Sequence, residues 1–407
     1  MTASTEVGGL DSDADSSPLG DRWRERARRE QRAAMPRGDV VLTCSAPLGT
    51  GGLGRHLSEL EAAVRSVNER PPICISGDRP ARDSLAGESR AARGDVRIPS
   101  FGRILARIPL VAPGVRTWAH MSEFDSLTKR SLPRADHLIA FNGQALAQLR
   151  AARRAGYESV ALVSANSHMR QVQRRHAEAR ERYPLEGSWT THMLARNLAE
   201  YALADRVYCA TDYIRDSFLE QGVPEQRLVP FPLTPDPRYA PLSPAHDGLE
   251  REPGGGRSGR DSGSSRFEIV YVGSLHVHKG VPLLIDAVRR LAHADLALTL
   301  VGGWGTRGMR RFVQGACAAD RRIVVAPGDP LPHLRRAALC AHPAYEDGFG
   351  YAPAEALACG VPVLVSEDTG MKELIDSPRR GLTLPTGDLD ALAQAIDAAY
   401  RGELFAR

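Results

Sequence analysis

Short apolar segments alternate with helical patterns over most of this chain, and this alternation limits the folds open to it. In the first half, helical patterns include His56–Val67 and Gln144–Ala155. The apolar segments that flank them are Val40–Cys44, Pro72–Ile75, His137–Phe141, Val160–Val163 and Arg206–Cys209. Strands of this kind, separated by amphipathic helices, predict an α/β fold in which helices cover both faces of a parallel sheet.

The same alternation begins again in the second half, which indicates a second domain. Its expected strands are Phe267–Val272, Leu298–Val301, Arg322–Ala326, Ala338–Ala341 and Val361–Val365. The helix between the first two has a buried stripe at helical spacing, formed by Leu283, Leu284, Ala287, Val288 and Leu291. A chain of 407 residues also exceeds one typical core. We therefore predict two Rossmann-like doubly wound domains, residues 37–232 and 233–407, facing each other across a cleft.

Three segments do not fit this alternation. Residues 1–36 combine Ser, Asp and Gly with an arginine-rich stretch, which predicts a disordered or partly helical tail. The proline-rich stretch from Pro230 to Pro244 is interpreted as the connection between the domains. Residues 246–266 are rich in Gly, Ser and Arg and are expected to form a flexible surface loop.

The composition is that of an ordinary globular protein, with 42% hydrophobic and 25% charged residues. The net charge of +4 is too small to indicate a nucleic-acid partner. Six cysteines are scattered without a Cys-x-x-Cys pair, and no histidine has metal-ligand spacing, so we expect no metal site. No apolar stretch approaches about 20 residues and the N-terminus has no apolar signal core, so a cytoplasmic location is expected.

A glycine loop follows the first expected strand and precedes a helix. Residues Gly49 to Gly54 read G-x-G-x-x-G, and Asp78 ends the next strand near the position of a ribose-binding acid in dinucleotide folds. A nicotinamide-dependent oxidoreductase is therefore one alternative, and a purely structural turn is another. We favour a loop that faces a ligand, with Arg55 directed at anionic groups.

The second domain begins with a similar loop, from Gly273 to Gly280. It contains Lys279, one of three lysines in the chain, between a strand and a helix. Ligands collect at this edge of open α/β sheets, and a lysine there can neutralise a diphosphate. The alternative is a solvated lysine without a ligand.

Two acids, Asp347 and Glu355, flank a glycine–aromatic–glycine turn and the start of an alanine-rich helix. Glycine lets the backbone approach a ligand closely, and a helix N-terminus favours phosphate. Carboxylates that accept hydroxyl hydrogen bonds, placed around such a turn, suit a sugar joined to a nucleotide diphosphate.

Together these segments resemble the retaining glycosyltransferases of the large family 4, which have the GT-B fold. The resemblance covers residues 38–400 and includes the Glu200–Val207 segment. It implies that Glu355 holds the ribose hydroxyls, that Asp347 contacts the donor sugar, and that Lys279 contacts the diphosphate. Further donor contacts implied by the resemblance come from Gly52, Arg55, Ser274, Glu346, Phe349, and the backbone of Gly350, Tyr351 and Ala352. His168 matches a histidine near the reacting sugar and is included with Asp347 and Lys279 as catalytic.

The chain departs from the family at three places. The first acid is usually glutamate, so the role is open between Asp347 and its neighbour Glu346. Ser274 stands where arginine is common, which removes one diphosphate charge. The chain also ends soon after the Asp388–Tyr400 helix, whereas relatives usually continue into a helix that crosses back onto the first domain.

The resemblance implies transfer of a sugar from a nucleotide-diphosphate sugar to a hydroxyl acceptor, without a metal or other cofactor. The acceptor is open between a saccharide, a lipid-linked molecule and a small molecule. A non-catalytic nucleotide-sugar-binding homologue is the second alternative. The Phe101–Trp118 stretch mixes apolar residues with arginines and fits either peripheral contact with the inner membrane face or a buried connection.

Overall fold

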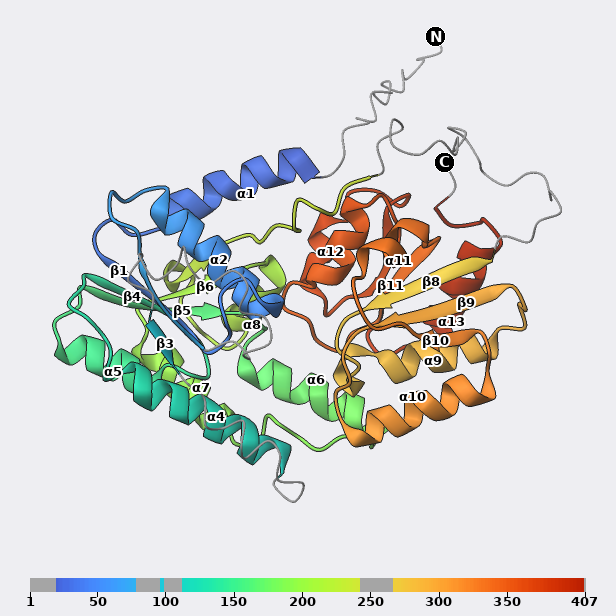
Figure 1. The fold of residues 1–407 in the computed structure, drawn as a ribbon, viewed down its shortest axis with the longest axis horizontal. Helices are drawn as coiled ribbons and strands as arrows, with labels where there is room; N and C mark the ends of the chain where they lie inside the picture. Colours follow the sequence, from blue (N-terminus) through green and yellow to red (C-terminus); the bar gives the residue numbers. More distant parts are fainter. Residues whose placement is uncertain (1–19, 78–95, 99–111, 242–265, 406–407) are drawn as a thin grey trace, which may run out of the picture.

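The structure is a computed structural model that describes residues 20–77, 96–98, 112–241 and 266–405. The described residues form two parallel sheets, one in each half of the chain (Figure 1). Two Rossmann-like α/β domains are therefore confirmed. No helix among these residues has the length and apolar character needed to cross a membrane.

The first domain is a seven-stranded sheet in the order β3-β2-β1-β4-β5-β6-β7. Every neighbouring pair is parallel. The strands are β1 (Val40–Cys44), β2 (Ile73–Gly77), β3 (Val96–Ile98), β4 (His137–Phe141), β5 (Ser159–Ser164), β6 (Arg206–Cys209) and β7 (Leu228–Pro230). Strand order reverses between β1 and β4, which places a topological switch point at their carboxyl ends.

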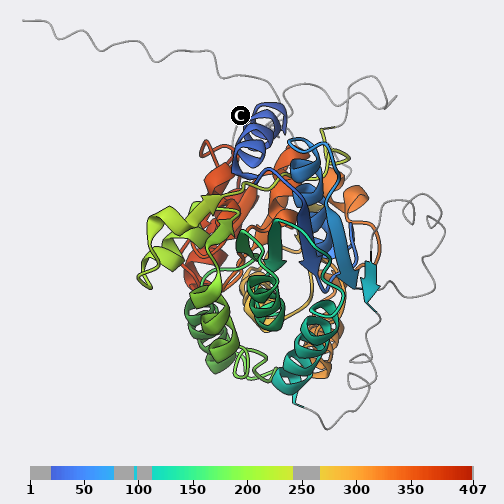
Figure 2. The same ribbon diagram turned by 90° about the vertical axis from the view of Figure 1, so that its left-hand side faces the viewer.

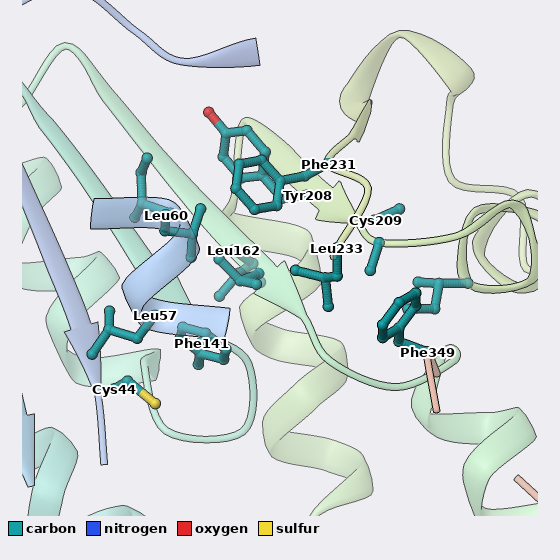
Figure 3. Packing of buried hydrophobic residues seen from close by; sticks show 14 of the residues in the cluster. Cys44, Leu57, Leu60, Phe141, Leu162, Tyr208, Cys209, Phe231, Leu233 and Phe349 are labelled. Atoms are coloured by element: carbon teal, nitrogen blue, oxygen red, sulfur yellow. The ribbon is translucent and has the colours of Figure 1, made fainter. Parts of the chain in front are cut away.

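Helices cover both faces of this sheet, as the two views in Figures 1 and 2 show. The helices of the first domain are α1 (Gly20–Ala34), α2 (Gly51–Arg65), α4 (Pro113–Thr128), α5 (Leu146–Arg154), α6 (Met169–Arg182), α7 (Leu194–Leu203) and α8 (Asp212–Leu219). Apolar residues of α2 and of the strands form one buried core, which includes Leu57, Leu60, Phe141 and Leu162 (Figure 3).

The second domain repeats the plan with a six-stranded parallel sheet in the order β10-β9-β8-β11-β12-β13. Its strands are β8 (Phe267–Val272), β9 (Leu296–Val301), β10 (Ile323–Val325), β11 (Leu339–His342), β12 (Val363–Ser366) and β13 (Gly381–Leu384). Its helices are α9 (Val281–Arg290), α10 (Arg307–Ala319), α11 (Leu331–Arg336), α12 (Tyr351–Ala358) and α13 (Leu389–Tyr400). The second switch point lies between β8 and β11.

Of the two alternatives for the tail, disordered or partly helical, the helical one applies to residues 20–34, which form α1. One face of this helix is buried, with Ala27 at 0% and Gln31 at 6% exposure. The Trp23 indole donates to the Leu233 carbonyl at 3.0 Å, and Gln31 Nε2 donates to the Pro232 carbonyl at 2.7 Å. The buried positions of α1 are few and lie four residues apart. The many arginines between them therefore leave no clear apolar pattern in the sequence.

Most expected elements are confirmed, but three short strands, β3, β7 and β13, were not expected. All three are edge strands of three or four residues. The domain boundary at 232/233 stays a prediction. The flexible loop lies almost entirely outside the described residues, which resume at 266.

Candidate functional site

Two loops meet at the switch point of the second domain, one after β8 and one after β11. Gly280 ends the first loop in a left-handed conformation, with φ of +73°. A Cβ atom added there would lie 1.9 Å from the Pro343 carbonyl oxygen. Only glycine permits this approach, so the two loops touch through their backbones. The contact positions Lys279 beside the loop that carries Asp347.

Lys279, Asp347 and His342 form one charged cluster. Lys279 Nζ and His342 Nε2 each lie 2.9 Å from Asp347 Oδ2. Burial alone would raise the pKa of the Asp347 carboxyl, but the Lys279 charge and the His342 hydrogen bond outweigh it and hold the pKa well below its usual range. The carboxyl is therefore ionised and held in place. His342 was missed in the sequence, although its position at the end of a central strand was an available signal.

Glu346 turns away from this cluster and contacts the first domain. Its two carboxylate oxygens accept hydrogen bonds from Asn166 Nδ2 and from the Ser167 backbone N–H, each at 2.9 Å. The side chain is fully buried, and burial raises its pKa. Of the two adjacent acids, Asp347 is therefore the one grouped with Lys279, and Glu346 links the domains.

The predicted turn and helix start lie directly after these acids. Gly350 has φ of +84° and precedes α12, so it supplies the left-handed turn into the helix. Phe349 is 4% exposed and packs edge-on against Tyr351, with ring centroids 4.9 Å apart. Glu355 is 3% exposed, and burial raises its pKa while Arg55 opposes the increase. Tyr351 and Ala352 are half-buried at the first turn.

The start of α2 in the first domain faces α12. Arg55 forms an ion pair with Glu355, and its guanidinium lies 4.2 Å from the centroid of the Tyr351 ring. One turn further along α2, Glu59 accepts a hydrogen bond from the Tyr351 hydroxyl at 2.9 Å. The structure thus brings Arg55 to the predicted donor residues and adds Glu59, which no local sequence signal marked.

The glycines of the first loop have different surroundings. Gly52 is exposed, and an added Cβ would approach Tyr351 Cδ2 at 3.8 Å, so this position faces α12. Gly54 is buried, and an added Cβ would lie 2.0 Å from the Pro47 carbonyl oxygen. Gly54 therefore serves tight packing of the turn. Asp78, the acid expected for dinucleotide binding, lies outside the described residues.

Ser274 and His168 stand apart from the charged cluster. Ser274 is exposed, and its carbonyl accepts a hydrogen bond from the Tyr271 hydroxyl at 3.0 Å. The His168 ring packs against Tyr201 and Phe218 in the first domain, and its Nδ1 accepts from the Arg170 N–H at 3.3 Å at the start of α6. Burial lowers the pKa of His168 to about 4, so the ring is neutral at pH 7. A catalytic role for His168 stays a prediction.

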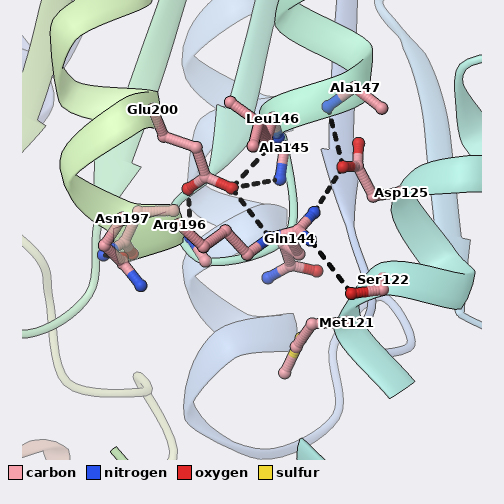
Figure 4. Close-up of polar contacts among 12 residues, drawn as sticks. Met121, Ser122, Asp125, Gln144, Ala145, Leu146, Ala147, Arg196, Asn197 and Glu200 are labelled. Atoms are coloured by element: carbon pink, nitrogen blue, oxygen red, sulfur yellow. Dashed lines mark hydrogen bonds and ion pairs between the residues drawn. The ribbon is translucent and has the colours of Figure 1, made fainter. Parts of the chain in front are cut away.

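A buried polar network holds the loop after β4 at the first switch point (Figure 4). Glu200 accepts hydrogen bonds from the Ala145 and Leu146 N–H groups at 2.9 and 3.0 Å. Arg196 forms ion pairs with both Glu200 and Asp125. These acids complement the N-terminus of α5, so the Glu200 segment shapes the loop through contacts within the first domain.

One group of potential metal ligands occurs among the described residues, and the expectation of no metal site stays a prediction. Glu186, His276 and His278 offer ligand atoms that all lie within 4.8 Å of one another. Sequence spacing could not reveal this group because Glu186 is 90 positions from His276.

The structure describes only the last part of the Phe101–Trp118 stretch, the candidate for membrane contact. Residues 101–111 of the Phe101–Trp118 stretch lie outside the described residues. Pro113 begins α4, and Val115 and Trp118 on this helix are 40% and 46% exposed.

Residues 266–401 match the family model described as glycosyl transferases group 1. The second domain is therefore similar to this family. The match spans the sheet of the second domain together with Lys279, Asp347 and Glu355. It favours sugar transfer over the nicotinamide alternative.

The chain is also similar in sequence to individual glycosyltransferases. A D-inositol 3-phosphate glycosyltransferase of Salinispora tropica is 29% identical over 349 residues, covering 75% of this chain and 70% of that protein. The enzyme of the same name from Paenarthrobacter aurescens is 29% identical over 166 residues, covering 37% of this chain and 40% of that protein. The O-antigen chain mannosyltransferase B of Escherichia coli is 28% identical over 135 residues, covering 31% of this chain and 35% of that protein. The chain thus matches less than half the length of these last two relatives.

Solved structures share the two-domain fold over nearly the whole chain. Sucrose-phosphate synthase from Thermosynechococcus elongatus has a TM-score of 0.66 at 18% identity, covering 89% of this chain and 90% of that one. HepE of Anabaena in complex with UDP has a TM-score of 0.60 at 14% identity, covering 90% of each chain. At such low identity these likenesses concern the fold alone.

Proposed function

We propose that this chain transfers a sugar from a nucleotide-diphosphate sugar to a hydroxyl acceptor, with retention of anomeric configuration and without a catalytic metal. The observation that carries the proposal is the grouping of Lys279, Asp347, Glu355 and Arg55 around the start of α12. Two cations and two carboxylates there match the diphosphate, ribose and sugar of such a donor. HepE has been solved with UDP and with UDP-glucose, which agrees with this class of donor.

The cations of the site are suited to a diphosphate. Arg55 Nη2 is buried without a hydrogen-bond partner among the described residues, although Nη1 pairs with Glu355. The Lys279 side chain is 18% exposed, and its Nζ pairs with Asp347. Phosphate oxygens would attract both groups, and the N-terminus of α12 would add its partial positive charge. Ribose hydroxyls would then donate to Glu355.

Catalysis would depend on how the site positions the two substrates and stabilises the charge on the leaving group. As the sugar leaves, negative charge grows on the departing diphosphate, and Lys279 and Arg55 would stabilise it. The leaving phosphate oxygen would accept the proton of the incoming hydroxyl on the same face of the sugar, which explains retention. The Asp347 carboxylate is already held by Lys279 and His342, which suits orienting the sugar better than attacking it.

A panel of UDP-, GDP- and ADP-sugars, with NAD(H) as comparison, tests the proposal on the full chain. We expect one nucleotide class to raise the melting temperature and to support transfer or slow hydrolysis that persists after metal chelation. Lys279→Ala and Glu355→Ala should abolish that turnover and retain the fold. Lys129→Ala and Glu367→Ala, at exposed positions, should retain the parent rate.

Two outcomes would reject the proposal. Nucleotide-sugar binding without turnover, over a broad set of acceptors, would favour a non-catalytic binding protein. Near-normal turnover in both Lys279→Ala and Glu355→Ala would place the chemistry elsewhere. Proton NMR of the product tests retention, because the anomeric coupling reports the new linkage.

A further inference from the structure

Three potential metal ligands from the two domains meet beside the Lys279 loop. Glu186 lies between α6 and α7, and His276 and His278 lie in the loop after β8. Glu186 Oε1 is 2.9 Å from His276 Nδ1, and Glu186 Oε2 accepts from the Val277 N–H at 2.9 Å. One carboxylate oxygen is thus already held by the backbone, while the other points at the imidazole pair.

A third imidazole adjoins this group. His176 on α6 is 4% exposed, and its Nε2 has no hydrogen-bond partner among the described residues. Its ring stacks on His278 with centroids 4.1 Å apart and contacts Trp189 edge-on at 5.4 Å. His176, Glu186 and His278 line one small pocket. A buried imidazole nitrogen without a partner is costly, and a ligand in this pocket would remove the cost.

We propose that Glu186, His276 and His278 bind a divalent transition-metal ion of the Zn²⁺ type, and that the ion links the two domains. Imidazole nitrogens and a carboxylate oxygen are the ligands that such ions prefer. Bonds of about 2.0–2.1 Å place tetrahedral ligand atoms about 3.3 Å apart. The observed limit of 4.8 Å requires only side-chain adjustments to reach that spacing. Water would take the fourth position, with His176 Nε2 available to it.

The polar surroundings are compatible with a cation. Arg180 also lines the pocket, but its Nε donates to the His176 carbonyl at 3.0 Å. The negative charge of Glu186 offsets part of the repulsion between the Arg180 guanidinium and a bound cation. A simple ion pair between Glu186 and His276 would leave His278 and the buried His176 nitrogen unexplained. Because His278 precedes Lys279, the bound ion would tie the segment after α6 to the loop that carries Lys279.

Metal binding by the chelator-treated full chain tests this site. Calorimetric titration should show one Zn²⁺ per chain, and Zn²⁺ should raise the melting temperature. Co²⁺ should give the visible absorption typical of tetrahedral coordination. Glu186→Gln and His278→Asn should each weaken Zn²⁺ binding by at least about 10-fold and remove the Co²⁺ spectrum, since even outer-shell changes cost this much.

His293→Asn is the matched control, because His293 Nε2 pairs with Asp397 at 2.6 Å in the same domain, outside the cluster. It should bind Zn²⁺ as the parent does. Circular dichroism establishes that each variant is folded, and His276→Asn replaces any variant that is not. Absence of stoichiometric Zn²⁺ binding, or Zn²⁺ binding that the folded ligand substitutions leave unchanged, would overturn the proposal. None of these readouts depends on sugar transfer.

Discussion

Arg55 and Glu355 are 300 positions apart in the chain and form an ion pair between α2 of one domain and α12 of the other. We expect Arg55→Ala to lower kcat/KM for nucleotide-sugar turnover by about 10²–10³, because a positioned donor to the leaving phosphate is lost. Arg55→Lys should recover only part of this, since lysine lacks the planar fork. Steady-state kinetics at saturating acceptor measures the effect. Arg65→Ala, at the far end of α2, is the control, and an Arg55→Ala variant with the parent's kcat/KM would contradict the assignment.

Asp347 and Glu346 are adjacent but should give opposite phenotypes. Asp347→Asn removes the charge that Lys279 and His342 hold, so turnover should fall sharply while thermal stability changes less. Glu346→Gln instead places an amide against Asn166 and the Ser167 N–H, which should cost about 1–3 kcal/mol of stability. Parallel kinetics and denaturant unfolding separate the two effects. The reverse pattern would assign the sugar-contacting role to Glu346.

Tyr351→Phe should weaken the contact between the domains. The lost hydroxyl donates to Glu59, which also accepts from Gln31 Nε2 and the Thr234 N–H, both at 3.0 Å. Burial raises the pKa of Glu59, and the Tyr351 hydrogen bond opposes that increase. We expect a loss of about 1.5–3 kcal/mol in the free energy of unfolding. Tyr400→Phe loses a similar bond to Asp295 at an exposed site and should cost less.

Gly280→Ala should strongly destabilise the Lys279 loop. The left-handed φ of +73° is strained for alanine, and its Cβ would collide with the Pro343 carbonyl. We expect a loss of about 2–4 kcal/mol. Gly315→Ala, within α10 and with no atom within 4 Å of an added Cβ, should instead stabilise by about 0.5–1 kcal/mol. Equal effects of the two substitutions in denaturant unfolding would be inconsistent with this structure.

Acid should destabilise the first domain through His56. Its ring packs between Phe141 and Phe231, and burial lowers its pKa from 6.5 to about 3. Below the ordinary pKa the unfolded chain binds a proton that the folded protein does not, so stability falls as the pH falls. This histidine alone should account for about 2 kcal/mol between about pH 7 and pH 5. His56→Phe keeps an aromatic ring at this position and should remove the part of the pH dependence that comes from His56. If denaturant unfolding of this variant shows the same pH dependence as the parent, His56 is not its source.

The sequence by itself determined the two sets of strands and helices and most of the candidate residues that the structure brings together. Apolar periodicity is local, so β1, β4, β6 and β8 could be located to the residue. Lys279, Asp347 and Glu355 could be identified because parallel sheets gather ligands at the carboxyl ends of their strands. Glycine at position 350 likewise marked a turn that the backbone requires.

Only the tertiary structure decided how these residues pair. The link from Glu346 to the Ser167 N–H, the pairing of Arg55 with Glu355, and the Glu186 cluster all join residues from the two domains. Helix α1 depends on the same kind of contact, since Trp23 donates to the Leu233 carbonyl 210 positions away. Such partners leave no periodic signal, because their proximity is fixed by how the two sheets pack and not by spacing along the chain.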